Sequence, residues 1–359
     1  MIVDFTKSAC SAATLAAALA LAMIALPAAP AYADDVSLTE TGSTLLFPLF
    51  KVWVDEYTKT HPGIHITTNA TGSGAGIEQA ISGAAQIGTS DAYMSDTQAR
   101  QHPEIINVPM AISALTVNFN LPGLNNANLK LDGPVLTDIY RGKIRAWDDK
   151  AIAALNPDVK LPHQDIIPVH RSEGSGDTFV FSQYLTFSTP SWENDIGYGT
   201  TIAWPTVAGG LSAEGNLGVL QLIQKTPYSI GYIGVSSHAE ITEAGLGTAA
   251  LKSYSGEYLL PSRETIAAAA AALTPRTPLD ERLTLVNAPG ANAYPLVNYE
   301  YAVVSTKQAK PEAAVALRKF LLWAIAPDES NEKLLDEAHF IALPAHIWVL
   351  SHDQIETIK

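Results

Sequence analysis

The sequence predicts an α/β fold built from two lobes. Its length of 359 residues suits about two domains at a typical ~150 residues each. Strand-like segments alternate along the chain with Gly/Ser/Thr-rich loops and helical patterns, which favours mostly parallel sheets covered by helices. The composition, 47% hydrophobic and 16% charged, is that of an ordinary globular chain. None of these three observations depends on a sequence motif.

The first 33 residues differ from the rest of the chain. Lys7 precedes an apolar Ala/Leu-rich run at 12–26, and Ala31-Tyr32-Ala33 follows it. This pattern is typical of a secretory signal peptide with an A-x-A cleavage site, so we expect residues 1–33 to be removed and the protein to act in the periplasm or at the cell exterior. The alternative, a membrane anchor, is disfavoured because the apolar run is shorter than the ~20 residues that a span needs.

The single cysteine, Cys10, lies within this segment. A lipid-anchored protein would carry a cysteine at the cleavage point, so we expect no direct membrane anchor. The mature chain then has no disulfide and no cysteine metal site, and its stability depends on its core.

The chain is strongly acidic, with a net charge of −14. Removing residues 1–33 takes away one acid, Asp4, and one base, Lys7, so that charge is unchanged. An acidic surface argues against nucleic acid and anionic membranes as partners. Any anion site must therefore be local, built from backbone dipoles and a few side chains.

Four strand-led units follow in the mature chain, three of them continuing into a helix. They are Val36–Leu38 with a helix through 45–57, Ile64–Thr68 with a helix from Ile77 to Gly83, Gln86–Ser90, and Ile166–Val169 with a helix from Thr178 to Leu185. The helical assignments rest on apolar residues that recur every three or four positions.

Two further apolar stretches, Ala111–Phe119 and Tyr294–Val304, bracket a middle portion rich in turn signals. We interpret them as crossover strands between the lobes. Lobe I then comprises 34–115 plus 294–359, and lobe II comprises 116–293.

Two helices are predicted outside this framework. The alanine run Ala267–Ala272 has the best helix propensity and suggests no function. The segment from Pro311 to Ile325 begins with proline in its first turn and carries apolar residues on one face, as a core helix does.

Three small-residue loops each lie between a strand and a helix start: TGSTL at 41–45, TGSGAG at 71–76 and SEGSGD at 172–177. Unpaired backbone N–H groups and the positive end of the helix dipole meet at such a place, so an oxyanion is stabilised without net positive charge. One such loop is weak evidence, because Ser, Thr and Gly are also ordinary cap and turn residues. Three in the same setting predict an oxyanion site.

Two charged residues adjoin these loops. Arg171 offers a planar fork of donors suited to two oxygens of a tetrahedral anion, although a surface ion pair is the alternative. Asp91 would repel a fully ionised anion but suits a ligand that still carries a proton; an Asx-turn is its alternative. Phosphate carries such a proton near pH 7, and sulfate does not.

Several stretches resemble the phosphate-binding proteins of phosphate-specific ABC transporters. They are TGSTLLFPL at 41–49, GSGAGIEQ at 72–79, GTSD at 88–91 and RSEGSG at 171–176, with GKIRAW at 142–147, IGYI at 230–233 and NYEYA at 298–302 as further landmarks. The resemblance spans nearly all of 36–350. It implies a type II periplasmic-binding-protein fold, two lobes with mainly parallel sheets joined by crossover strands.

The resemblance also implies a function. The protein would be a receptor rather than an enzyme, with no catalytic residue, metal or cofactor, that captures inorganic phosphate and delivers it to a membrane permease. We expect a monomer. The expected phosphate-binding residues are Ser43, Thr44, Leu45, Ser73, Asp91, Arg171, Ser175, Gly176 and Asp177.

Three of the carboxylates have particular roles in this scheme. Asp91 accepts the phosphate proton. Glu173 stands where an aspartate usually pairs with the arginine, and should still reach Arg171. Asp177 replaces a common threonine donor, as in receptors of mycobacterial type, so the chain is expected to be closest to actinobacterial receptors. We hypothesise that Asp177 is a second proton acceptor that favours monobasic phosphate.

Other functions remain open. A receptor for sulfate or molybdate is disfavoured because Asp91 would have no proton to accept, whereas arsenate should compete. An exported phosphate-ester hydrolase would need a serine nucleophile, but residues 71 and 173 are Thr and Glu where a nucleophile elbow needs Gly, so neither Ser73 nor Ser175 fits. The nine histidines show no metal spacing. A surface adhesin is the third alternative.

Overall fold

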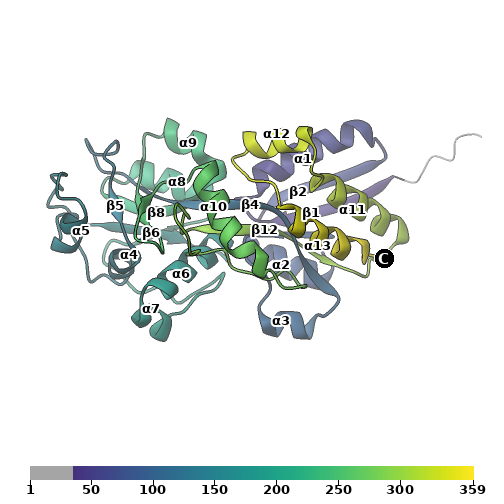
Figure 1. Ribbon diagram of the computed structural model, residues 1–359, viewed down its shortest axis with the longest axis horizontal. Helices are drawn as coiled ribbons and strands as arrows, with labels where there is room; N and C mark the ends of the chain where they lie inside the picture. Colours follow the sequence, from purple (N-terminus) through teal and green to yellow (C-terminus); the bar gives the residue numbers. More distant parts are fainter. Residues whose placement is uncertain (1–34) are drawn as a thin grey trace, which may run out of the picture. The chain divides into compact units, whose positions relative to one another are not determined.

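A nine-stranded sheet organises the computed structural model, which describes residues 35–359 (Figure 1). The signal peptide expected at 1–33 lies outside the described residues. The strand order is β2-β1-β3-β12-β4-β8-β6-β7, and β9 pairs with β4. The strands are β1 (Val36–Gly42), β2 (Ile64–Ala70), β3 (Ile87–Ser90), β4 (Ile105–Phe119), β6 (Ile167–Arg171), β7 (Leu211–Ala213), β8 (Ser229–Gly234), β9 (Gly247–Thr248) and β12 (Val297–Ser305). A small separate sheet joins β11 (Tyr258–Leu259), β10 (Ala250–Lys252) and β5 (Lys130–Leu131).

The sheet is parallel at both ends and antiparallel in the middle. Strand β1 runs parallel to β2 and β3, and β6 runs parallel to β7 and β8. Strand β12 is antiparallel to β3 and β4, and β4 is antiparallel to β8. In Figure 1, β4 and β12 cross the centre between the purple N-terminal elements and the teal middle elements. The predicted α/β class is confirmed.

Strand β4 carries the sheet from one parallel group to the other. Its residues Ile105–Ala114 pair with β12, and Leu115–Phe119 pair with β8. The strand expected from Tyr294 begins later, at Val297. Pro295 has no N–H to donate to a strand ladder, which explains the late start.

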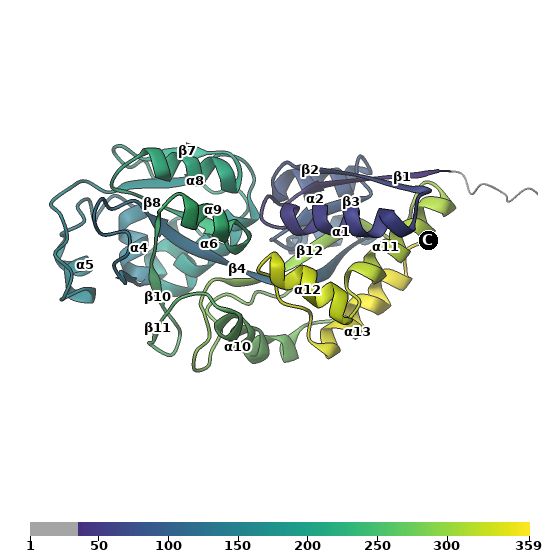
Figure 2. The same ribbon diagram turned by 90° about the horizontal axis from the view of Figure 1, so that it is seen from above.

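Thirteen α-helices are present within residues 35–359. They are α1 (Phe47–Thr60), α2 (Ser73–Ser82), α3 (Asp96–Gln101), α4 (Gly133–Tyr140), α5 (Lys150–Leu155), α6 (Gly176–Ser188), α7 (Pro190–Asp195), α8 (Gly215–Lys225), α9 (His238–Glu243), α10 (Arg263–Leu273), α11 (Pro311–Ala324), α12 (Glu329–Glu337) and α13 (Ala345–Glu356). Two short 3-10 helices are η1 (Val235–Ser237) and η2 (Thr274–Arg276). Helices α11, α12 and α13 pack beside β1, α1 and β4 respectively, so the C-terminal helices lie against the N-terminal part of the fold (Figure 2). None of the helices in the described part of the chain is long and apolar enough to cross a membrane.

Helix α2 begins earlier than the sequence predicts, at Ser73 rather than Ile77. Glycine is a poor helix former, so the Gly-rich stretch was expected to be a loop. At Gly76, however, a Cβ atom would lie 2.5 Å from the Thr89 carbonyl oxygen, so this glycine allows the helix to pack closely on β3. The packing overrides the propensity, and Ser73 lies in the first helical turn.

The segments expected to carry chemistry follow β1, β2, β3 and β6. Within each parallel group the carboxyl ends of neighbouring strands lie at the same edge, where ligands of open α/β sheets bind. The fold therefore brings 41–45, 71–76 and Asp91 to one edge of the first group, and Arg171 with 172–177 to an edge of the second.

Candidate functional site

The second and third loops touch through their backbones. The Gly74 N–H donates to the Gly174 carbonyl oxygen at 2.9 Å. A Cβ atom at Gly174 would lie 3.2 Å from the Gly74 Cα. The two glycine loops, which come from different strand groups, are therefore in direct contact.

Asp91 lies at the centre of the first cluster, which we call the Asp91 half: Ser43, Ser73 and Asp91. The Ser43 hydroxyl donates to Asp91 Oδ1, and the Ser73 hydroxyl donates to Asp91 Oδ2 at 3.1 Å. The Asp91 N–H in turn donates to Ser73 Oγ at 3.2 Å. All three side chains are buried. Among residues 35–359 no basic side chain pairs with Asp91, and the donors to its carboxylate include the hydroxyls of Ser43 and Ser73.

Gly176 joins this cluster to the third loop. A Cβ atom at this position would lie 2.5 Å from Ser73 Oγ and would also clash with Asp91 Oδ2. Only glycine allows the N-terminus of α6 to lie against Asp91. The helix end and the carboxylate therefore face the same small volume.

Arg171 organises the second cluster, which we call the Arg171 half: Thr44, Arg171, Glu173 and Asp177. The Arg171 side chain is buried and forms ion pairs with both Glu173 and Asp177. Its Nε–H donates to Glu173 Oε1 at 2.7 Å, and a terminal N–H donates to Thr44 Oγ1 at 3.1 Å. Thr44 comes from the first loop, so this hydrogen bond also links the two strand groups.

The Arg171 half holds more acid than base. Burial raises the pKa of Asp177 to about 7, against the opposing effect of Arg171, and repulsion from Asp91 and Glu173 adds to the rise. Asp177 Oδ1 and Glu173 Oε2 are buried and accept no hydrogen bond from residues 35–359. Two acceptor oxygens of this cluster are thus without a donor.

The remaining predicted residues are hydrogen-bonded within the loops. The Leu45 N–H donates to Ser43 Oγ at 3.1 Å. Ser175 caps α6, because its Oγ accepts from the Thr178 N–H at 3.2 Å, and its own N–H donates to the Thr200 carbonyl at 2.8 Å. The nine predicted ligand residues and Glu173 lie on these three loops, at Asp91 and at Arg171, the last residue of β6, and the structure brings these segments together.

Comparison with known proteins identifies the family. Residues 27–328 match the family model described as the PBP superfamily domain. The chain is 33% identical over 346 residues to the phosphate-binding protein PstS of Methanocaldococcus jannaschii, covering 91% of this chain and 87% of that protein. This chain belongs to the PstS family of phosphate-binding proteins. The PstS of Haemophilus influenzae is 30% identical over 328 residues, covering 91% and 93% of the two chains.

Solved structures agree on the fold. A crystal structure of the phosphate-binding protein from Stenotrophomonas maltophilia superimposes with a TM-score of 0.68, at 18% identity, covering 89% of this chain and 93% of that one. A phosphate transport receptor from Vibrio cholerae gives a TM-score of 0.56 at 19% identity, covering 86% and 100%. The expected periplasmic-binding-protein fold is confirmed.

Two residues that the sequence did not single out support the Arg171 half of the site. Asn216, in the first turn of α8, donates from Nδ2 to Thr44 Oγ1 at 3.0 Å and accepts from the Gly234 N–H at 2.7 Å. The Tyr232 hydroxyl accepts from the Arg171 N–H at 3.1 Å and is hydrogen-bonded to Thr178 Oγ1 at 2.7 Å. Tyr232 lies in the IGYI landmark, whereas no motif marks Asn216.

A third missed residue is Glu300 of β12. It is fully buried, and Asn298 links it to Asp91, because Asn298 Nδ2 donates to Glu300 Oε1 at 2.8 Å and to the Asp91 carbonyl oxygen at 3.4 Å. The NYEYA landmark contains it, but the sequence assigned it no role.

His170 is a packing residue in this structure. Its ring stacks on Trp204, with ring centres 4.8 Å apart, and its Nδ1 lies 2.9 Å from the Arg171 carbonyl oxygen. Burial lowers its pKa, which favours the neutral ring. Within residues 35–359 no group of three or more His, Cys, Asp or Glu side chains could hold a metal ion.

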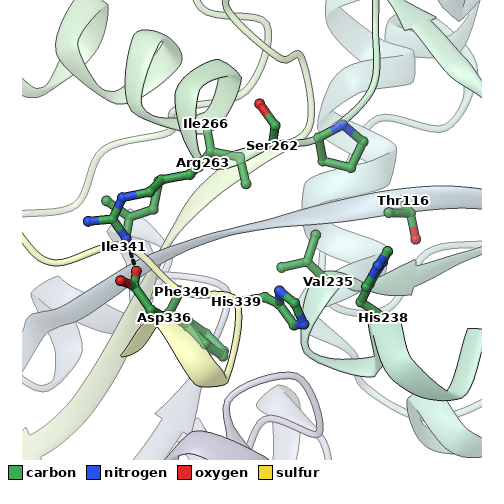
Figure 3. A pocket seen from close by; sticks show the side chains of 11 residues that line it. Thr116, Val235, His238, Ser262, Arg263, Ile266, Asp336, His339, Phe340 and Ile341 are labelled. Carbon is green, nitrogen blue, oxygen red and sulfur yellow. Dashed lines mark ion pairs between the residues drawn. The ribbon is translucent and has the colours of Figure 1, made fainter. Parts of the chain in front are cut away.

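A separate cavity of about 350 Å³ is lined by residues that include Val235, Arg263 and Phe340 (Figure 3). Its lining includes His238 and His339, whose ring centres are 5.1 Å apart, and the ion pair between Arg263 and Asp336. It contains none of the predicted ligand residues. The converging loops therefore form the candidate ligand site.

Proposed function

We propose that this protein is a receptor that captures inorganic phosphate outside the cytoplasm and delivers it to the permease of an ABC transporter. The observation that carries the proposal is the meeting of Asp91 and Arg171, together with the first turns of α2 and α6, at one place. Family membership supports the same ligand, since the relatives are phosphate-binding proteins by name.

The chemistry of the two charged residues suits phosphate. Four of the five Arg171 N–H groups donate to Glu173, Asp177 and Thr44, so Arg171 offers the anion its charge and one further donor. The first-turn N–H groups of α2 and α6 can donate to other oxygens of the anion. Asp91 can accept a hydrogen bond from the hydroxyl that phosphate still carries. Sulfate lacks that hydroxyl and would leave a buried acceptor facing an anion, and sites of this kind discriminate by ~10⁴ or more.

Asp177 serves as a second acceptor in this proposal. Its Oδ1 has no donor among the described residues, and its pKa of about 7 means that it ionises in the range where phosphate loses its second proton. A ligand with two hydroxyls can donate to both Asp91 and Asp177. The site therefore favours monobasic phosphate.

The same residue carries a narrower proposal, that the receptor is of actinobacterial type. Only Asp177 supports it. The phosphate-binding protein PstS 3 of Mycobacterium leprae is 28% identical over 318 residues, covering 86% of this chain and 83% of that protein. That identity is below that of the archaeal relative.

We further propose two lobes, 34–115 plus 294–359 and 116–293, that close over the ligand. The change of partner along β4 after Ala114 supports a hinge there. The ligand contacts must then come from both lobes, because a ligand drives closure only through contacts that it makes better in the closed state. Small-angle scattering should show a smaller radius of gyration when phosphate is added; an unchanged radius would contradict the hinge.

The remaining proposals concern the setting of the protein. It acts as a monomer in the periplasm or at the cell exterior after its signal peptide is removed, without a direct membrane anchor and without nucleic acid as a partner. Sedimentation of the mature chain tests whether it is a monomer. Sequencing of the N-terminus of the exported protein tests whether the signal peptide is removed.

Calorimetric titration of the mature, ligand-free protein with phosphate, arsenate and sulfate tests the proposal. We expect tight binding of phosphate, competition by arsenate and no measurable heat from sulfate. Equal affinity for phosphate and sulfate would contradict it. A phosphomonoester assay on the same sample separates receptor from hydrolase, and we expect no turnover, since the Ser73 hydroxyl donates to an aspartate rather than to a base such as histidine.

A further inference from the structure

Glu300 is a buried acid directly behind the proposed phosphate proton acceptor. Strand β12 runs antiparallel to β3 with Tyr301 opposite Ser90, and Asn298 Nδ2 donates to both Glu300 Oε1 and the Asp91 carbonyl oxygen, so Glu300 lies near Asp91. Its exposed fraction is 0%. Two ionised carboxylates side by side in a buried place would repel each other strongly.

The hydrogen bonds of Glu300 distinguish its two oxygens. Oε1 accepts from the Ser113 hydroxyl at 2.6 Å and from Asn298 Nδ2 at 2.8 Å. Oε2 accepts from no donor in the described part of the chain, although it is buried. An ionised carboxylate needs donors on both oxygens, whereas a carboxylic acid carries a donor of its own on one of them. The pattern is that of an acid whose proton is on Oε2.

The surroundings of Glu300 favour the neutral form. Burial raises its pKa well above the ordinary range, and the neighbouring Asp91 raises it further. Asp91, at the end of β3, is the charged group that faces it; Ser113 on β4 and Asn298 on β12 are neutral donors. No positive side chain in residues 35–359 forms an ion pair with Glu300.

The proton on Glu300 has a role among the donors around Asp91. An ionised carboxylate accepts at about four lone-pair positions. The Ser43 and Ser73 hydroxyls occupy two of them. A hydrogen bond from protonated Glu300 occupies a third lone-pair position, which leaves one position for a hydroxyl of the ligand.

We propose that Glu300 is a neutral carboxylic acid that donates a hydrogen bond to Asp91 and so holds Asp91 as the acceptor of the hydrogen bond from the phosphate hydroxyl. Glu300 is a positioning residue for ligand selectivity and does not touch phosphate. Without this donor, only the hydroxyls of Ser43 and Ser73 hold the Asp91 carboxylate in place as an acceptor, so the distinction between phosphate and sulfate would weaken. This inference rests on the proposed function.

Two substitutions test whether the hydrogen-bond donor at position 300 matters, rather than the volume of the side chain. Glu300→Gln keeps an acceptor for Ser113 and Asn298 and a donor toward Asp91. Glu300→Met fills a similar volume without either. Glu281→Gln is the matched control, because Glu281 is also a buried acid but is bonded to Ser351 and Gln354, away from the loops.

Calorimetry at pH 7 gives the affinities for phosphate and sulfate, with thermal melting to check the fold. We expect Glu300→Gln and Glu281→Gln to keep phosphate affinity within about threefold of wild type, and Glu300→Met to lose about tenfold or more, as a lost buried donor to a charged acceptor costs. We also expect the ratio of phosphate to sulfate affinity to fall only in Glu300→Met. The proposal would be overturned if Glu300→Gln lost as much phosphate affinity as Glu300→Met. Wild-type selectivity for phosphate over sulfate in Glu300→Met would also overturn it.

Infrared difference spectroscopy observes the proton without any ligand. The spectrum of wild type minus Glu300→Gln at pH 7 should contain the C=O band of a protonated carboxyl group. A carboxylate band there instead would overturn the proposal. This readout is independent of Glu300→Met folding and of phosphate binding, so it separates a failure at Glu300 from a failure of the proposed function, which would appear as a wild-type protein that binds no phosphate.

Discussion

The Asp91 half and the Arg171 half of the site stabilise buried charge in opposite ways. The Asp91 carboxylate is surrounded by neutral donors, the hydroxyls of Ser43 and Ser73. The Arg171 guanidinium is surrounded by carboxylates, Glu173 and Asp177. One half therefore contains an acid without a base, and the other contains a base with more acid than it can neutralise.

This difference indicates how an acidic protein selects an anion. With three carboxylates and one guanidinium, the cluster does not attract an anion by net charge. It offers directed donors, from Arg171 and the helix ends, and acceptors that only a protonated ligand can satisfy. The Arg171 half binds the charge of the ligand, and the Asp91 half recognises its hydroxyl.

The largest expected effect comes from removing the guanidinium. Arg171→Ala deletes the charged donor and leaves Glu173 and Asp177 buried without their partner. Truncating one partner of a buried charge pair at a binding site costs roughly 2–5 kcal/mol of binding free energy, so we expect phosphate affinity to fall by a factor on the order of 10³. Calorimetric titration measures it.

The control for this change is Arg141→Ala, which removes an arginine paired with the exposed Asp195 and should leave affinity unchanged. Arg171→Lys keeps the charge without the fork of donors and should be intermediate. Wild-type affinity in a folded Arg171→Ala protein would remove the Arg171 half from the site.

A smaller effect is expected from Asp177→Asn, and it concerns pH. Burial raises the pKa of Asp177 to about 7, so the residue becomes ionised as the pH rises through neutrality. Both Asp177 and phosphate then lose protons, and the affinity of the wild-type protein should fall between pH 6 and 8.5. In Asp177→Asn the side chain cannot ionise, so the fall should be shallower by up to about tenfold, which corresponds to one pKa unit. Identical slopes in titrations across that range would exclude Asp177 as a proton acceptor.

The smallest effect is on stability alone. Glu40 lies on β1 and is buried; its Oε1 accepts from the Thr89 hydroxyl at 2.5 Å, and its Oε2 has no donor among the described residues. Burial raises its pKa to about 7. A raised folded-state pKa means that the stability is fully present at low pH and is lost as the pH rises from the unfolded-state value near 4.5 through about 7.

Glu40→Gln should therefore be more stable than wild type at pH 8, by on the order of 1–2 kcal/mol, and no more stable at pH 4. Thermal melting at the two pH values measures this difference, and phosphate affinity should not change. Equal destabilisation at both values would mean that the ionised carboxylate is satisfied in the fold.

The sequence predicts the elements of the site better than their connections. The loops at 41–45, 71–76 and 172–177 stand out because glycine and hydroxyl residues follow strand patterns, and the alternation of strands and helices is local information. The early start of α2 at Ser73 is not local, because it depends on Gly76 packing against Thr89. Propensity alone could not reveal it.

Two connecting residues were beyond sequence reasoning for a similar reason. Glu300 reaches Asp91 through the pairing of β12 with β3, and Asn216 reaches Thr44 across the two strand groups. Neither the register of distant strands nor the contact of separate groups leaves a periodic or motif signal along the chain. A buried acid within a strand, such as Glu300, is the nearest signal, because unpaired acids are rarely buried without a role.

The claim that the Asp91 half recognises a ligand proton is tested most directly by Asp91→Asn. Asparagine keeps the size of the side chain and replaces one acceptor oxygen by a donor. The measurement is the ratio of phosphate to sulfate affinity, by calorimetry at pH 7, in the wild type and in this variant. We predict that the ratio falls by at least about a hundredfold, with sulfate binding improved. An unchanged ratio would contradict proton recognition by Asp91.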